Sequence, residues 1–196
     1  DVAGVTFDMT TLSMEEGNSG IYQVKLDTQP TASVTVAISA AGGAEVGLST
    51  ELLVFSTANY DSYQSVTVSA INNDIAEDTQ TATLSHSLTS TDAFYQAFAA
   101  EDVVVTVTDS MDAIGVDVTM SWWWLTVTEG GSADTIKVKL ESEPVEDVEI
   151  VVTASDQLLV GGSGTTTLTF TSANWHIEQE VSVTAVDDDV VEEMHA

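Results

Sequence analysis

Two halves of opposite character meet in the stretch Val181-Ser182-Val183-Thr184-Ala185-Val186-Asp187-Asp188-Asp189. In the first half apolar and small polar residues alternate, which is typical of a half-buried β-strand. In the second half three carboxylates follow one another, and Glu192 comes shortly afterwards. Consecutive strand residues face opposite sides, so these carboxylates converge only if the strand ends and the backbone turns. The stretch therefore predicts a β-strand that delivers acidic side chains to one end of a sheet.

The chain contains this stretch twice, as part of a tandem duplication. The matched segments recur at a spacing of about 114 residues and keep their order, which chance does not explain. They are Glu16-Gly17 with Glu129-Gly130, Val24-Lys25-Leu26 with Val138-Lys139-Leu140, Phe55–Tyr60 with Phe170–Trp175, and Ile71–Glu77 with Val186–Glu192.

Both copies are predicted to be all-β. Period-two alternation with Val, Ile and Thr indicates antiparallel strands at 22–26, 34–38 and 66–70, and at 136–140, 148–152 and 181–185. About seven short strands in about 110 residues fit an immunoglobulin-like β-sandwich. We therefore expect two tandem sandwiches, at residues 1–111 and 112–196. A helix is expected only as a turn or two within residues 92–100.

The second sandwich is predicted to be incomplete. The first copy continues through Thr81–Leu84 and Asp102–Val107, and nothing after Glu193 corresponds to these two strands. Core and sheet edges are then exposed. Two explanations stay open: the sequence is a fragment of a longer protein, or a neighbouring chain donates the strands. The fragment is favoured because donated strands are rare.

Composition narrows the classes of partner. Against 32 acidic residues stand 3 basic ones, a formal net charge of -29, which disfavours nucleic acid and anionic membrane surfaces. There is no cysteine for a disulfide or a thiolate metal site. No apolar run approaches the roughly 20 residues that span a bilayer. Specific cation sites and a generally acidic surface adapted to salt both explain the charge, and the clustering of acids at matching positions favours the sites.

Three motifs together resemble one family. They are Thr126-Val127-Thr128-Glu129-Gly130-Gly131, the Phe170–Trp175 segment with its Ala-Asn-Trp ending, and the Val181–Asp189 stretch. Together they resemble the Calx-beta domain, which is known from sodium–calcium exchangers and from many bacterial surface proteins. The resemblance implies a β-sandwich that holds Ca²⁺ at one end.

The resemblance also implies the ligands of that ion. In the first copy they are Glu16, Asp74, Glu77, Asp109 and Asp112; in the second they are Glu129, Asp187, Asp188, Asp189 and Glu192. Asn72 and Asn73 stand where the second copy has Asp187 and Asp188, so we expect weaker binding in the first copy. The second copy lacks its exit strand, so its site is expected to be short of ligands. A solvated acidic loop is the alternative interpretation.

Other motifs are less specific. Trp122-Trp123-Trp124 is interpreted either as packing between the sandwiches or as a sugar-stacking platform. His86, His176 and His195 lack zinc spacing and are interpreted as surface or loop residues. No catalytic residues or enzyme cofactor site are identified, because no pair of acids or nucleophile motif stands out.

We therefore expect a non-enzymatic, calcium-binding structural or adhesive module of a large secreted or cell-surface protein. Ca²⁺ would make tandem sandwiches rigid. The expected partners are Ca²⁺, neighbouring repeats or protomers, and surface glycans or proteins, with no nucleic acid and no membrane insertion. The alternatives are a carbohydrate-binding module that uses Trp122–Trp124, a fibre subunit completed by strand donation, and a regulatory Ca²⁺ sensor.

Overall fold

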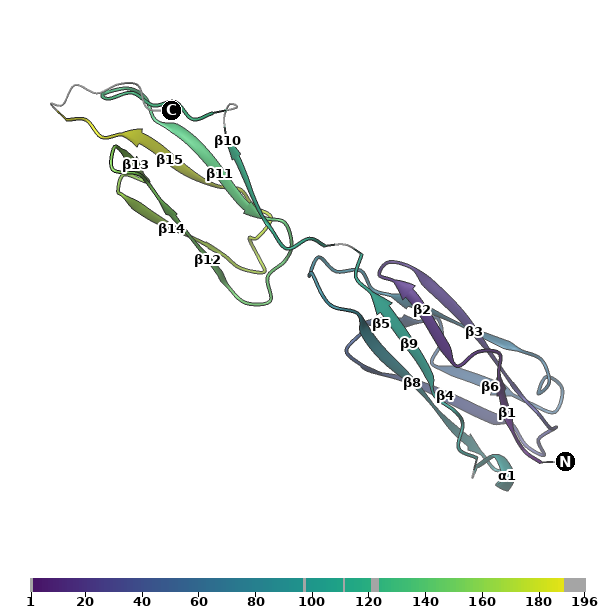
Figure 1. Cartoon of the computed structure of the whole chain (residues 1–196). Helices are drawn as coiled ribbons and strands as arrows, with labels where there is room; N and C mark the ends of the chain where they lie inside the picture. Colours follow the sequence, from purple (N-terminus) through teal and green to yellow (C-terminus); the bar gives the residue numbers. More distant parts are fainter. Residues whose placement is uncertain (1, 97, 111, 121–123, 189–196) are drawn as a thin grey trace. The chain divides into compact units, whose positions relative to one another are not determined.

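The computed structural model describes residues 2–96, 98–110, 112–120 and 124–188 of the 196-residue chain (Figure 1). The residues cluster into two compact units. The first consists of Asp1–Asn73 and Glu77–Ser110, and the second of Asp74–Ala76 and Met111–Ala196. Within the described residues, no helix is long and apolar enough to cross a membrane.

The first unit is a sandwich of two sheets, as the alternating segments predicted. Its elements are β1 (Val5–Phe7), β2 (Thr11–Glu15), β3 (Ser19–Leu26), β4 (Val34–Gly42), β5 (Val46–Leu48), β6 (Leu52–Phe55), β7 (Gln64–Ala70), β8 (Gln80–Ser90), α1 (Ala93–Gln96) and β9 (Val103–Thr108). One sheet has the order β1-β3-β7-β5 and the other β2-β9-β8-β4-β6 (Figure 1). The inner faces of the two sheets share one continuous core.

The short helix α1 lies where a turn or two was expected. Asp92 precedes it and accepts a hydrogen bond from the Phe94 backbone N–H at 2.9 Å, as an N-cap residue does. Its other carboxylate oxygen accepts from the backbone N–H and the hydroxyl of Thr31, at 2.8 and 2.9 Å. These bonds from Thr31 favour the ionised form and lower the pKa of Asp92. Tyr95 is then held in the core.

His86 corrects a sequence interpretation, because it lies in the core and not at the surface. Its Nδ1 lies 2.9 Å from the carbonyl oxygen of Glu101, and its Nε2 lies 2.9 Å from the hydroxyl of Tyr22. A carbonyl only accepts, so Nδ1 carries the proton and Nε2 accepts from Tyr22. Burial lowers the pKa of His86, while the Glu101 carbonyl and the charge of Asp102 act in the opposite direction. In the structure, His86 shares the inward face of β8 with Ala82 and Leu84.

One strand pairing differs from the antiparallel pattern that was predicted. β2 pairs with β9 in parallel, from Thr11 opposite Val104 to Glu15 opposite Thr108. Parallel neighbours need a long connection, and here the rest of the sandwich provides it. The ends of β2 and β9 therefore meet at the same edge of the sheet.

The second unit repeats one sheet fully and the other in part. Its elements are β10 (Val116–Met120), β11 (Asp134–Leu140), β12 (Val148–Thr153), β13 (Leu158–Val160), β14 (Thr165–Phe170) and β15 (Gln179–Ala185). The sheet β10-β11-β15-β13 repeats the order β1-β3-β7-β5 of the first unit, and β12-β14 repeats the pair β4-β6. Among the described residues of this unit, no strand corresponds to β2, β8 or β9.

The repeated Ala-Asn-aromatic motif has the same role in both units. In the first, the Asn59 side-chain oxygen accepts from the Ser56 backbone N–H, and its amide donates to the Val54 carbonyl. In the second, Asn174 makes the equivalent bonds to Thr171 and Thr169. The asparagine thus closes the turn that follows β6 or β14. The motif encodes a turn and not a ligand site.

Candidate metal centre

The candidate site of the first unit begins where β2 and β9 end side by side. Glu16 follows β2, and its backbone N–H donates to the Thr108 carbonyl at 3.0 Å. Asp109 is the first residue after β9. The parallel pairing therefore places two acidic residues at one sheet edge, although they are far apart in the sequence.

A tight turn follows Glu16 and explains the Glu-Gly motif. The Asn18 backbone N–H donates to the Glu15 carbonyl, and the Gly17 N–H donates to the Ala70 carbonyl, each at 3.1 Å. Gly17 has a φ of 74°, a left-handed conformation that residues with a Cβ rarely adopt. Gly130 has a φ of 61° at the matching position of the second unit. The glycine lets the chain reverse directly after the acidic residue.

Two carboxylates of the first unit come together at this edge. Glu16 and Asp109 each offer one oxygen, these oxygens lie within 4.8 Å of each other, and both residues are half-buried. Asp112, another predicted ligand, belongs to the second unit. A pair of carboxylates at this spacing can begin an oxygen shell for a hard cation.

The two carboxylate oxygens of Asp109 have different surroundings. One of its carboxylate oxygens, Oδ2, accepts a hydrogen bond from the Glu77 backbone N–H at 3.3 Å. The other, Oδ1, is buried and has no hydrogen-bond partner among the residues that the structure describes. A buried charged oxygen without a partner is costly in free energy. This oxygen needs a positive group that the described protein does not supply.

The few basic residues of the chain lie elsewhere. Lys25 lies over the ring of Tyr63, at 5.1 Å from its centroid. Lys137 contacts Glu178 at 2.9 Å and Glu180 at 3.5 Å, and these carboxylates raise its pKa. Lys139 lies 3.7 Å from Asp117. Since the chain has only three Lys and Arg residues together, and all three lie elsewhere, no lysine or arginine balances Glu16 and Asp109.

The structure places the other two predicted ligands of the first copy differently. Glu77 approaches Asp109 through its backbone N–H, and its carboxylate is not part of the acidic group. Asp74 belongs to the second unit, where its carbonyl accepts a hydrogen bond from the Glu143 backbone N–H at 2.7 Å. Of the five predicted ligands of the first copy, Glu16 and Asp109 converge within the first unit, and Asp112 belongs to the second.

The predicted site of the second copy does not form a comparable group within the described residues. Glu129, Asp187 and Asp188 are exposed there. Asp189 and Glu192 lie outside the described residues. No described strand corresponds to β9, so no exit aspartate is brought beside Glu129. The second copy has more acidic residues at the matching positions, so stronger binding there stays a prediction.

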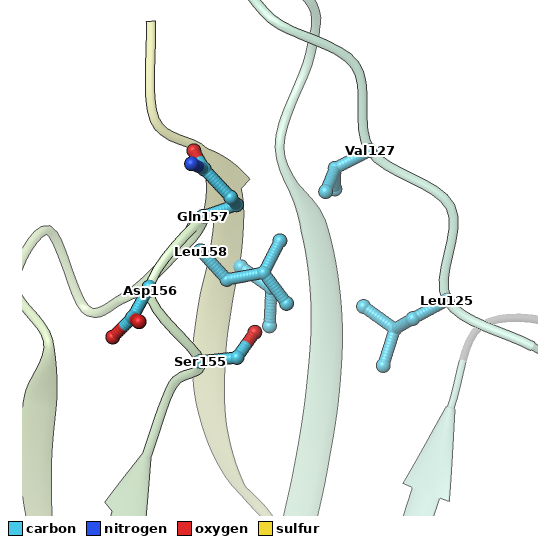
Figure 2. A pocket seen from close by; sticks show the side chains of 7 residues that line it. Leu125, Val127, Ser155, Asp156, Gln157 and Leu158 are labelled. Atoms are coloured by element: carbon cyan, nitrogen blue, oxygen red, sulfur yellow. The ribbon is translucent and has the colours of Figure 1, made fainter. Parts of the chain in front are cut away.

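Sequence reasoning missed a cavity of about 460 Å³ in the second unit. Figure 2 shows Leu125 and Val127 on one segment, with Leu158 across the cavity from Leu125. Ser155, Asp156, Gln157 and Val183 complete its lining. The side-chain oxygen of Gln157 is buried and lacks a hydrogen-bond partner among the described residues. The signal that could have found this cavity is that no described strand of this unit corresponds to β9.

The tryptophan triplet is described only at its last member. Trp124 is 72% exposed. Trp122 and Trp123 lie outside the described residues, so the packing of the triplet between the sandwiches stays a prediction.

Comparison with known proteins finds similarity in fold only. No family model and no curated protein matches the chain. Solved structures do. The apo form of the Calx CBD1 domain has 12% identity and a TM-score of 0.44, and the match covers 56% of this chain and 99% of that one. The calcium binding domain CBD12 of CALX1.1 has 14% identity and a TM-score of 0.43, covering 94% and 76%. The class 5 fimbriae chaperone CfaA has 6% identity and a TM-score of 0.39, covering 97% and 96%.

Solved Calx domains are thus among the structures to which this chain is similar, as the Calx-beta resemblance of its motifs predicted. A likeness this distant carries no argument about what the chain binds. The class that the chain itself defines is an all-β protein of two β-sandwich units, with an acidic group at one strand edge.

Proposed function

We propose that the chain is a non-enzymatic, calcium-binding structural module, and that Glu16 and Asp109 of the first unit hold the ion. The observation that carries this proposal is the buried Oδ1 of Asp109. It lies beside the carboxylate of Glu16, and no lysine or arginine balances these two carboxylates. A bound cation would remove both the repulsion among the carboxylates and the cost of burying this oxygen.

Calcium is favoured over other cations by the chemistry of the donors. The group consists of carboxylates, and the chain has no cysteine that would select a softer metal. Mg²⁺ demands near-ideal octahedral geometry, whereas Ca²⁺ accepts six to eight oxygen ligands in flexible arrangements. Backbone carbonyls and water would complete such a shell.

Isothermal titration calorimetry tests this proposal. Ca²⁺ should bind to the chain, and Mg²⁺ at the same concentration should bind much more weakly. Asp109→Asn removes one ligand charge and should weaken Ca²⁺ binding at the first unit at least about tenfold. Glu51→Gln removes the same charge from an exposed position outside the group and serves as the control. Equal Ca²⁺ binding by the Asp109→Asn and Glu51→Gln proteins would contradict the proposal.

We further propose an extracellular or cell-surface location in a larger structural or adhesive assembly. The tandem sandwiches and the acidic composition support this proposal, because millimolar Ca²⁺ occurs outside cells and suits sites of modest affinity. The partners would be neighbouring repeats or protomers and surface glycans or proteins. Labelling of intact cells with an antibody against this chain tests the location. Labelling that requires permeabilised cells would contradict it.

Glycan binding is a second candidate function, because Trp124 exposes a large aromatic surface. Polysaccharides that stack on the indole should quench or shift tryptophan fluorescence. Trp124→Ala should abolish this response, whereas Trp175→Phe, at a half-buried position, should keep it. Unchanged emission across a broad panel of glycans would count against this function.

A further inference from the structure

One short segment, β1 with β2, closes one side of the first sandwich. β1 is an edge strand of one sheet, where it pairs with β3, and β2 is an edge strand of the other sheet, where it pairs with β9. The exposed residues 8–10 connect the two strands. Leu12 and Met14 of β2 also lie against Gly20 of β3, because a Cβ at Gly20 would be 3.1 and 3.0 Å from them. The chain therefore crosses from one sheet to the other beside β3.

The buried His86 lies behind this crossing. β8 pairs with β9 only from Gln80 to Leu84, so the loop that contains Glu101 is its neighbour at His86. The Phe7 ring of β1 covers the imidazole, with 4.7 Å between the ring centroids and an interplanar angle of 61°. His86 is 7% exposed, whereas Phe7 is half-buried. Phe7 thus separates the imidazole from solvent.

The hydrogen bonds of His86 suit a neutral imidazole. Nδ1 donates to the Glu101 carbonyl, and Nε2 accepts from the Tyr22 hydroxyl. A proton added at Nε2 would make it a donor, and the hydroxyl proton of the fully buried Tyr22 would lose its acceptor. Burial raises the pKa of Tyr22, so its hydroxyl keeps this proton. Protonation of His86 in the closed sandwich therefore buries a charge and leaves a donor unpaired, and both are costly.

Few charged groups surround the ring. Asp102 is the carboxylate whose charge favours the protonated form, but burial is the larger cause and lowers the pKa of His86. β4 places Ile38 opposite His86, and β1 covers it with Phe7, and neither side chain titrates. Asp8, next to Phe7, is exposed. A protonated imidazole would therefore gain most from contact with water.

We propose that β1 and residues 8–10 form an acid-sensitive lid, and that protonation of His86 releases Phe7 and β1 from the sandwich. β1 is the part that can move most easily, because three residue pairs join it to β3, from Val5 opposite Leu26 to Phe7 opposite Val24. β4, by contrast, is paired with strands on both of its sides.

The direction of the effect follows from proton linkage. When the lid is open, water reaches His86 and its pKa returns to about 6.5. The open state then binds the proton more readily than the closed state, so a fall in pH favours opening. The opening equilibrium can rise by at most about tenfold per pH unit, since one proton is taken up. Opening exposes the backbone groups of β3 that β1 had paired, and a free strand edge can pair with another strand. This edge would be available at acidic pH.

Hydrogen exchange of the full chain at pH 7.5 and 5, corrected for the intrinsic exchange rates, tests the proposal. The backbone N–H groups of Asp8 and Asp27 report on the lid, because they bond to the carbonyls of Gln23 and Gly4 across the β1–β3 pair. Their protection should fall about tenfold or more at pH 5. The amides of β4 should keep theirs. In His86→Asn, which has no group to protonate there, protection of the lid should not change with pH.

The pKa of His86, measured by NMR titration of its ring protons, tests the role of Phe7. Phe7→Ala uncovers the imidazole and should raise this pKa toward 6.5. Tyr63→Ala removes an exposed aromatic ring of the same unit and should leave it unchanged. If Phe7→Ala does not fold, the exchange measurement on the wild type still decides, because it needs no change at Phe7.

Three results would overturn the proposal. The protection of Asp8 and Asp27 could be the same at both pH values, His86→Asn could lose it as the wild type does, or β4 could lose protection together with the lid. The last result would mean that the whole unit unfolds. His86 contacts neither Glu16 nor Asp109, so the outcome should be the same in EDTA and in Ca²⁺. The test is therefore independent of the calcium proposal.

Discussion

The two units are copies of one sequence pattern, but the described part of the second has no counterpart of three strands of the first, β2, β8 and β9. In the first unit β8 and β9 extend the sheet that contains β4, and the core is closed. In the second unit the described part of this sheet consists of β12 and β14, and residues at matching positions are half-buried. The burial of an apolar strand residue is thus set by the neighbouring strands as much as by its own pattern.

β9 also accounts for the difference at the candidate metal centre. It fills the core with Val103, Val105 and Val107, and Asp109 follows it directly, beside Glu16. The strand that completes the core therefore also delivers an acidic side chain. The second unit has no counterpart of this strand among its described residues, and no group of three acids is found there.

The largest loss of stability is expected for substitutions at positions that are equally buried in the two cores. Phe55 and Phe170 are both fully buried at matching positions. Phe→Ala at either position should lower the free energy of unfolding of its unit by about 3–5 kcal/mol. Chemical denaturation with each variant measures this loss. A much smaller loss for Phe170→Ala would show that the two cores are not equivalent there.

A smaller loss of stability, which differs between the two units, is expected on β4 and on its counterpart β12. Val34→Ala, at a position with 0% exposure, should lower the free energy of unfolding by about 2 kcal/mol. Val148→Ala makes the same change where the side chain is half-buried, and should cost less than about 1 kcal/mol. Denaturant midpoints at equal slopes measure both losses. Equal losses would contradict the claim that the second core is open.

Substitution of the glycine that follows Glu16 or Glu129 should destabilise both units equally. Gly17→Ala and Gly130→Ala place a Cβ at a positive φ and should each lower stability by about 1 kcal/mol. In the first unit this turn also positions Glu16, so Gly17→Ala should weaken Ca²⁺ binding as well. Thermal unfolding and calorimetric titration measure the two effects. If Gly17→Ala stabilised the first unit, the left-handed conformation of Gly17 would be contradicted.

The smallest effect is a pH dependence confined to the first unit. Burial lowers the pKa of His86, so the unfolded state binds its proton more readily than the folded state. The stabilising contribution is present above the unfolded pKa of about 6.5 and is lost as the pH falls through the folded pKa. Asp102 faces the same ring and moderates this loss.

The pH dependence can be measured as the difference between the wild type and His86→Asn, from pH 7.5 to 5. His176→Asn, at an exposed position, is the control and should leave the profile unchanged. Identical profiles for the wild type and His86→Asn would contradict the buried, neutral state of His86.

Much of the fold could be predicted from the sequence because it is encoded locally. The alternation at Val34–Ile38 and at Val148–Val152 identified strands that the structure confirms. The absence of counterparts to β8 and β9 predicted the exposed edge. The parallel pairing of β2 with β9 could not be predicted, because strand periodicity does not say which distant segments pair. The burial of His86 was not predicted for the same reason, because its hydrogen-bond partner Tyr22 lies on the other sheet.

The candidate metal centre could be predicted only in part. Family resemblance proposed Glu16 and Asp109, and the structure brings these two together in the first unit. It also proposed Asp74, whose backbone bonds to Glu143 in the second unit. A run of acids in the sequence does not say which carboxylates converge, because convergence depends on where strands end and how they pair.

The most direct test of the calcium centre is differential scanning calorimetry of the first unit's transition. A ligand at about 100 times its Kd adds about 2.7 kcal/mol, which raises the melting temperature of a unit of this size by about 10 °C. We predict such a rise in Ca²⁺ over EDTA at matched ionic strength, and its loss in Asp109→Asn. A rise that NaCl reproduces, or that Asp109→Asn retains, would contradict the account.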